Sequence, residues 1–196
     1  PATLHDVRLV ADVSVLHSPG EVRVEGESSI TRFPGSVKRV WLEPNNPSAY
    51  PQAIQAILAA EIIVVGPGSL YTSILPNLLV PDVAAAIRAS RALKIFVSNV
   101  ASEMGETDGF TCGDYVRVME EHITGSLFDI VVLNSNYEGT LPEGVEWVRG
   151  DPEQDADYAL YMANLVDSGT PWRHDSAKLA EVLIDLYQER TGPLVE

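Results

Sequence analysis

Residues 62–69 read IIVVGPGS, and this stretch decides the fold class. Ile62–Val65 is a short run of branched apolar residues, and Gly66, Pro67 and Gly68 follow it directly. A short apolar run that stops at glycine and proline is typical of a parallel strand that is covered on both faces. In open parallel sheets, ligands bind beyond the carboxyl ends of the strands. The stretch therefore predicts an α/β protein with a candidate binding loop after this strand.

The segments on either side of this strand alternate between helix and strand patterns. Helices are predicted at 51–60, 83–90 and 114–122, and strands at 94–97, 129–133, 144–148 and 158–165. A last helix is predicted with Ser176 or Asp175 as its cap and an apolar face that runs from Leu179 to Tyr187. Alternation of this kind predicts parallel βαβ units.

The first forty residues follow a different, two-residue period. Apolar side chains alternate with polar ones over 7–15, and the alternation resumes over 22–26 and 37–42. Turn-forming residues at 17–21 separate the first two runs. Residues 7–43 are therefore predicted to form a small antiparallel unit, inserted as a β-hairpin. The length of 196 residues favours one domain over 1–196.

Composition excludes several classes of function. The chain carries 13 Lys+Arg and 28 Asp+Glu, a formal charge of −15, so nucleic acid and anionic membranes are poor partners. A single cysteine excludes a disulfide framework and fits a cytoplasmic protein. No segment looks like a membrane span, and no His/Cys pair has the spacing of a metal site. Homo-oligomerisation stays open.

The loop after the first predicted parallel strand is the first candidate site. Its glycines let a ligand approach the backbone, and its hydroxyls and free N–H groups could cradle a phosphate. The candidate residues are Gly66, Pro67, Gly68, Ser69, Thr72 and Ser73. The alternative is a tight strand-to-helix turn in which the hydroxyls only cap the helix.

Two further segments lie at predicted loops. The segment 98–111 contains Asn99, Glu106, Thr107, Asp108 and Gly109, which could meet ligand hydroxyls or help to hold Mg²⁺. Arg173 precedes the last helix and could bind phosphate, with His174 held in one tautomer by Asp175. The alternatives are an ordinary turn in the first case and a helix cap in the second. Catalytic residues stay unassigned.

The string IIVVGPGSLYTSILPNLLV at 62–80 closely resembles the CofD/YvcK family, the 2-phospho-lactate transferases together with the gluconeogenesis factors of bacteria. The resemblance continues through GETDGFT at 105–111 and RHDSAKLAEVL at 173–183, and it reaches back through GESSI at 26–30. It covers nearly the whole chain. Family members begin with a strand and a GGGTG-like loop, so this chain resembles the C-terminal portion of a member.

The resemblance implies a three-layer, Rossmann-like α/β fold that binds a nucleotide or nucleotide sugar. Gly68-Ser69-Leu70 and 105–109 match the gluconeogenesis-factor arm, whose members resemble cytoplasmic regulators that bind UDP-sugars and influence wall synthesis and cell shape. The resemblance thus favours a nucleotide-sugar-binding regulator of carbon flux. The alternative that it leaves is a transferase that moves a phospholactyl group from a guanylated donor to a deazaflavin precursor, with Mg²⁺.

Overall fold

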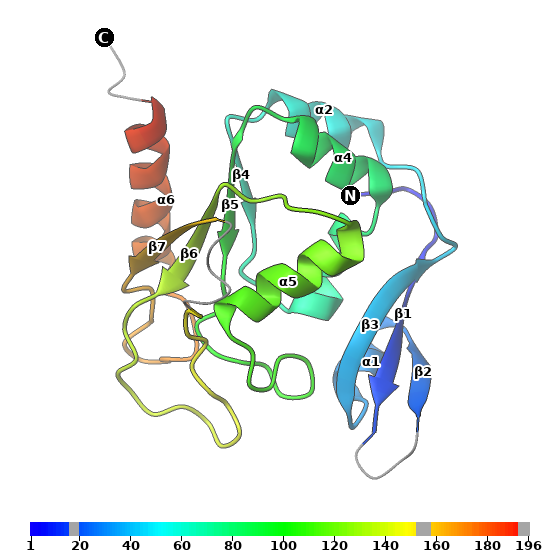
Figure 1. Cartoon of the computed structure of the whole chain (residues 1–196), viewed down its shortest axis with the longest axis horizontal. Helices are drawn as coiled ribbons and strands as arrows, with labels where there is room; N and C mark the ends of the chain where they lie inside the picture. Colours follow the sequence, from blue (N-terminus) through cyan, green and yellow to red (C-terminus); the bar gives the residue numbers. More distant parts are fainter. Residues whose placement is uncertain (16–19, 152–157, 192–196) are drawn as a thin grey trace.

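Four parallel strands form the central sheet of the computed structural model, which describes residues 1–15, 20–151 and 158–191. Their order in the sheet is β4 (Ile62–Val65), β5 (Leu93–Val97), β6 (Ile130–Asn134) and β7 (Ala159–Ala163), as Figure 1 shows. The strand order follows the chain, and the register pairs Val65 with Phe96 and Val97 with Val132. The carboxyl ends of β4, β5 and β6 therefore lie at the same side of the sheet. The predicted parallel α/β core is confirmed.

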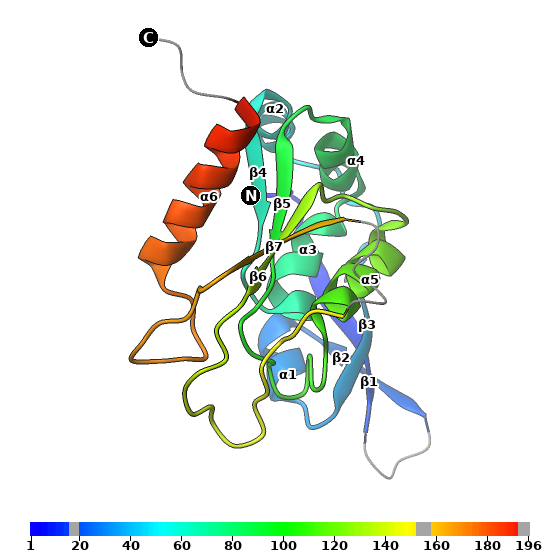
Figure 2. The ribbon, with the colours of Figure 1, turned by 60° about the vertical axis from the view of Figure 1, so that its left-hand side comes forward.

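Helices cover both faces of this sheet, which makes three layers (Figure 2). One face packs on α6 (Ser176–Thr191): Ile95 and Val97 share a buried cluster with Val182 and Leu186. On the other face, Phe96, Val131 and Leu133 belong to the larger cluster. The helices on that side are α2 (Pro51–Ala59), α3 (Leu75–Leu78), α4 (Pro81–Ala89) and α5 (Cys112–Ile123). Because neighbouring residues of a strand point to opposite faces, a strand buried on both sides is apolar throughout.

A separate antiparallel sheet precedes this core, in the order β2-β1-β3. Its strands are β1 (Arg8–Ser14), β2 (Glu21–Glu25) and β3 (Ser36–Glu43). The predicted antiparallel unit is therefore confirmed. Most of the predicted turn at 17–21 lies outside the described residues. Leu9, Ala11 and Val40 on its inner face are buried in the same cluster as the helices of the α/β core. The small sheet therefore packs against the core through apolar side chains.

The structure corrects one predicted element and adds three that the sequence did not predict, among them α3 (Leu75–Leu78). Residues 144–148 form no strand: they make one isolated bridge, Trp147 with Ala101, and pair with a loop instead of a sheet. The short helix α1 (Glu27–Arg32) lies between β2 and β3, and a π-helical turn, η1 (Leu70–Ile74), follows the first candidate loop. Alternation alone could not exclude 144–148, because a segment paired at a single bridge can show the same pattern.

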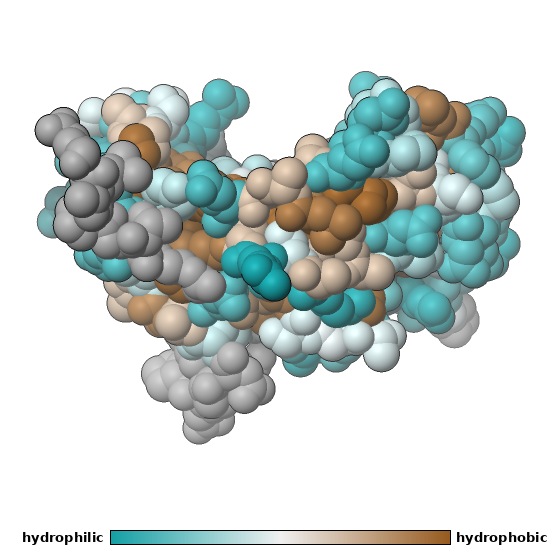
Figure 3. Space-filling model, turned by 90° about the horizontal axis from the view of Figure 1, so that it is seen from above, coloured by the Kyte–Doolittle hydropathy of each residue, from teal (hydrophilic) through white to brown (hydrophobic). Residues whose placement is uncertain are grey.

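Some apolar side chains stay at the surface. Leu58 of α2 is 51% exposed, and Val64 of the edge strand β4 is 39% exposed. Seen from above, the outline has a notch between the α6 side and the α2 side, with apolar residues beside it (Figure 3). In the part of the chain that the structure describes, no single helix is long and apolar enough to cross a membrane. Leu70–Leu78 and Pro81–Ala89 meet the criteria of length and composition only as a pair bent by 74°.

Candidate functional site

The loop after β4 has a backbone that only glycine can adopt at its first position. Gly66 has φ +82°, and a Cβ placed there would lie 2.7 Å from the backbone oxygen of Val97 on the neighbouring strand. The Gly66–Pro67 peptide bond is cis. Gly68 differs, because a Cβ there would meet only ordinary contacts at 3.6 Å or more. The loop thus turns tightly against β5 and leaves room beside Gly68.

Asn99 connects this loop to the end of β5. Its Oδ1 accepts a hydrogen bond from the backbone N–H of Gly68 at 3.1 Å, and its Nδ2 donates to the carbonyl of Gly68 at 3.2 Å. The same Nδ2 also donates to Oε1 of Glu103 at 3.2 Å. Both polar atoms of the side-chain amide are therefore hydrogen-bonded within the protein, and Asn99 positions both Gly68 and Glu103.

A cavity of about 480 Å³ opens where this loop, the segment after β5 and the segment before α6 meet. Its volume lies in the range of about 300–1,000 Å³ that is usual for small-molecule sites. Glu103, Arg173 and His174 bring charged or titratable groups, while Val145 and Trp172 bring apolar surface. The remaining lining residues are Pro67, Gly68, Asn99, Val100, Ala101 and Ser102. We call this cavity the rim cavity.

The segment before α6 is fixed by its own hydrogen bonds. Oδ1 of Asp175 accepts from the backbone N–H groups of Ala177 and Lys178, at 2.9 and 3.2 Å, and so caps α6. His174 Nε2 lies 3.1 Å from the carbonyl oxygen of Ser98, which can only accept, so this nitrogen carries the hydrogen. Burial lowers the pKa of His174, and the ring is neutral at pH 7. The ring thus bonds to Ser98, while the Oδ1 atom of Asp175 caps the helix.

Glu106 and Thr72 lie outside the rim cavity. Glu106 is 6% exposed, and its carboxylate accepts hydrogen bonds from Thr72 Oγ1 at 2.9 Å and from the backbone N–H of Tyr71 at 3.3 Å. Burial raises the pKa of Glu106 above its ordinary value. The pair ties the 105–109 loop to η1, the π-helical turn that follows the glycine loop. Both residues therefore position backbone and do not line the rim cavity.

Most of the other candidates do not line the rim cavity. Thr107 is buried, and its Oγ1 accepts hydrogen bonds from the backbone N–H of Glu103 and from Tyr115 Oη, both at 2.9 Å. Asp108 is exposed and accepts from the backbone N–H of Gly105, and Gly109 lies in the same turn at φ +71°. Gly66 and Ser73 line a second, apolar groove of about 310 Å³ along β4, and Ser69 begins η1. The predicted residues that line the rim cavity are Pro67, Gly68, Asn99 and Arg173.

Signals in the sequence are weaker for the remaining lining residues. Glu103 falls four residues after Asn99 in a polar loop, and that spacing could have suggested a pair. Val145 comes from a distant segment, which is held because the backbone N–H of Ser102 donates to the carbonyl of Glu146 at 2.8 Å. The Glu146 N–H donates in turn to Ser102 Oγ at 2.9 Å. No local sequence pattern at Val145 predicts this contact.

The rim cavity offers few ligands for a metal ion. Glu103 is its one carboxylate. Across residues 1–15, 20–151 and 158–191, no group of three or more His, Cys, Asp or Glu side chains is arranged to hold a metal. Mg²⁺ typically uses one or two carboxylates together with substrate phosphates. The residues present therefore do not form a metal site by themselves.

Comparisons with known proteins assign the chain to a family. Residues 1–186 match the family described as 2-phospho-L-lactate transferase CofD. The chain belongs to the CofD family. A family relative in Listeria monocytogenes, named gluconeogenesis factor, is 37% identical over 86% of this chain and 54% of its own length. A relative in Aquifex aeolicus is 38% identical over 96% of this chain and 60% of its own length.

A solved structure supports the same assignment. The crystal structure of a UPF0052-family protein from Bacillus halodurans matches with a TM-score of 0.81 and 30% sequence identity, over 94% of this chain and 60% of that chain. This CofD-family chain therefore spans somewhat more than half the length of these relatives, between 54% and 60%.

Proposed function

We propose that this CofD-family chain binds a nucleotide sugar of the UDP-sugar type in the rim cavity and acts as a cytoplasmic regulator of carbon flux, cell-wall synthesis and cell shape. The observation that carries the proposal is the convergence of three segments on one cavity. The glycine loop after β4, the Asn99–Glu103 segment after β5 and the segment before α6 all line it. This is the position at which open parallel sheets bind their ligands.

The chemistry of the cavity suits a ligand with a diphosphate and sugar hydroxyls. The guanidinium of Arg173 can bind phosphate oxygens through two parallel hydrogen bonds. The carboxylate of Glu103 accepts one hydrogen bond from Asn99 and retains further acceptor positions for hydroxyl groups. Trp172, which is 40% exposed, supplies a flat apolar surface for a base or sugar ring.

The relatives support the regulator over the enzyme. The Listeria monocytogenes relative is named gluconeogenesis factor, a name that refers to gluconeogenesis and states no reaction. Since the chain spans only part of that relative, the activity of the whole protein belongs to this proposal.

Calorimetric titration of UDP-N-acetylglucosamine into the chain tests the proposal, with GDP as the comparison ligand. We expect the UDP-sugar to bind and GDP to bind at least about tenfold more weakly, which corresponds to about 1.4 kcal/mol. Arg173→Gln should weaken binding, because it removes the cation that faces the phosphates. Arg91→Gln is the matched control: it removes an exposed arginine outside the cavity. Equal loss in both variants, or no binding by the unmodified chain, would contradict the proposal.

The second candidate function is the transferase named by the family description. It requires Mg²⁺ held mainly by the phosphates of a guanylated donor, since Glu103 is the one carboxylate in the cavity. Incubation with guanylated phospholactate, Mg²⁺ and the deazaflavin acceptor separates the two candidates. Formation of the phospholactyl product would favour the transferase, and binding of the UDP-sugar without product would favour the regulator.

A further inference from the structure

His122 joins helix α5 to the antiparallel sheet through a hydrogen bond at the free side of β3. In the antiparallel sheet, β3 is an edge strand that pairs with β1 on one side only. On its other side, the backbone N–H of Val40 donates to Nε2 of His122, on α5, at 3.2 Å. The inward-facing side chain of Val40 is buried, so this N–H lies where an unpaired donor is costly.

The partner of the second ring nitrogen determines the tautomer of His122. Nδ1 lies 2.7 Å from the carbonyl oxygen of Val118, one turn earlier on α5. A carbonyl can only accept, so Nδ1 carries the hydrogen and Nε2 is the bare acceptor that Val40 requires. A second proton on the ring would occupy Nε2. It would then place two N–H donors against each other and remove the hydrogen bond.

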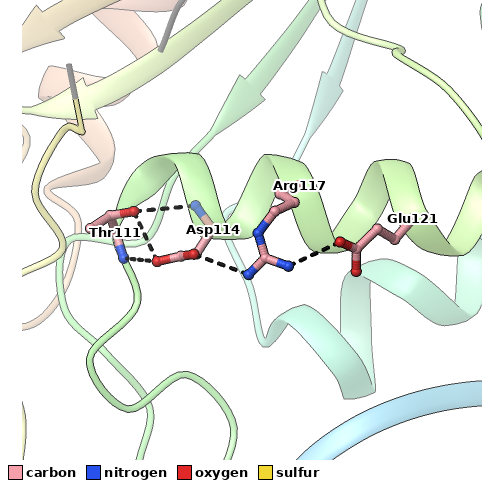
Figure 4. A network of polar contacts seen from close by, with 4 residues as sticks. All are labelled: Thr111, Asp114, Arg117 and Glu121. Atoms are coloured by element: carbon pink, nitrogen blue, oxygen red, sulfur yellow. Dashed lines mark hydrogen bonds and ion pairs between the residues drawn. The ribbon is translucent and has the colours of Figure 1, made fainter. Parts of the chain in front are cut away.

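The surroundings of His122 act on the extra proton in both directions. The hydrogen bond to the Val118 carbonyl favours it, Arg39 of β3 disfavours it, and Glu121 of α5 favours it. The Glu121 carboxylate is already paired with Arg117 at 3.0 Å, and Arg117 also pairs with Asp114 (Figure 4). Lys38 of β3 and Arg88 of α4 line the two hollows beside the ring, and the ring of Tyr71 from η1 meets it edge-on at 6.1 Å. Burial is the largest influence, and it lowers the pKa of His122 below its ordinary value of 6.5.

We propose that His122 is a proton-operated latch, which fastens the outer edge of β3 to α5 when the ring is neutral and releases it when the ring is protonated. The latch connects to the candidate site through its neighbours. On the same edge of β3, the Val37 N–H donates to the carbonyl of Gly105 at 3.1 Å. Gly105 belongs to the loop whose Thr107 holds the backbone of Glu103. Opening of the latch therefore loosens one support of the rim cavity.

Hydrogen exchange of the Val40 amide, followed by NMR on the full chain from about pH 8 to about pH 5, tests the latch. We expect the protection of this amide, corrected for the intrinsic exchange rate, to fall several-fold. The midpoint of this fall should coincide with the titration of the His122 ring, measured from its Cε1–H shift in the same samples. Protection that stays constant while the ring titrates would overturn the proposal.

Three variants separate the latch from other titrations. His122→Gln places an amide oxygen near the position of Nε2 and cannot titrate, so the Val40 amide should lose its pH dependence. The buried His174 remains in that variant, so any pH effect of His174 stays visible. His122→Phe removes the acceptor, and the amide should exchange rapidly at every pH. His5→Gln changes an exposed histidine and should keep the original profile. An unchanged pH profile in His122→Gln would refute the latch.

Discussion

Alanine substitutions at the two glycines of the first loop should have very different costs. At Gly66, alanine must adopt φ +82°, which costs an L-residue roughly 1–2 kcal/mol. Its Cβ would also lie 2.7 Å from the carbonyl oxygen of Val97, a fully buried residue of β5 that cannot easily move. Overpacking of this kind costs about 1–3 kcal/mol. Gly66→Ala should therefore lower the free energy of unfolding by roughly 2–5 kcal/mol.

At Gly68 the same substitution meets no strain. The backbone is not left-handed there, and the nearest contact of a Cβ, Ser73 Cβ at 3.6 Å, is ordinary. Gly68→Ala should stay within about 1 kcal/mol of the unmodified chain. Urea unfolding, followed by tryptophan fluorescence and analysed by linear extrapolation, measures both differences. Equal costs for the two variants would refute the reasoning, because they share one loop and differ only in φ and in the atom that the Cβ meets.

Three other substitutions test separate parts of the structure. Glu106→Ala leaves the two donors of the buried carboxylate without an acceptor and should cost about 2–5 kcal/mol, whereas Glu106→Gln should cost less than about half of that. Burial holds the folded-state pKa of Glu106 above its ordinary value of 4.5, so the free energy of unfolding should fall as the pH rises from 4.5 through the folded-state pKa. Glu106→Gln should remove this pH dependence, as measured by urea unfolding at several pH values. Thr111→Ala removes the capping box of α5 shown in Figure 4 and should lower the free energy of unfolding, measured in urea, by about 1 kcal/mol. A free energy of unfolding equal to that of the unmodified chain within error would contradict the assigned cap. Phe96→Ala, at a fully buried position of β5, should cost about 3–5 kcal/mol and lower the thermal midpoint more than the surface substitution Leu58→Ala does.

The sequence predicted the strands because their environments leave clear patterns. In the run Ile62–Val65, Ile62 packs on the cluster at one face of the sheet, and Ile63 and Val65 pack on the cluster at the other face. The alternation in 7–15 reflects a sheet with one face on the core. The segment 144–148 shows the limit of this reasoning. Its residues alternate like a strand, but the backbone pairs at only one position with the loop after β5.

The candidate site was predictable by segment more than by residue. Strand ends located the glycine loop and Asn99, since the topology brings these ends together. The sequence pattern does not say in which direction each side chain points. Glu106 and Thr107 are polar and follow a strand, but their side chains are buried and make hydrogen bonds that position the backbone. Tertiary contacts decide such directions, and a local sequence pattern does not record them.

Hydrogen exchange across the whole chain, with and without saturating UDP-N-acetylglucosamine, tests the central claim most directly, because it reports where a ligand binds. We expect slower exchange in three segments that line the rim cavity: 67–68, 99–103 and 172–174. The amides of β1 and β2, which belong to the separate antiparallel sheet (Figure 1) and do not line the cavity, should stay unchanged. Unchanged exchange in all three segments, or protection confined to the antiparallel sheet, would contradict the account.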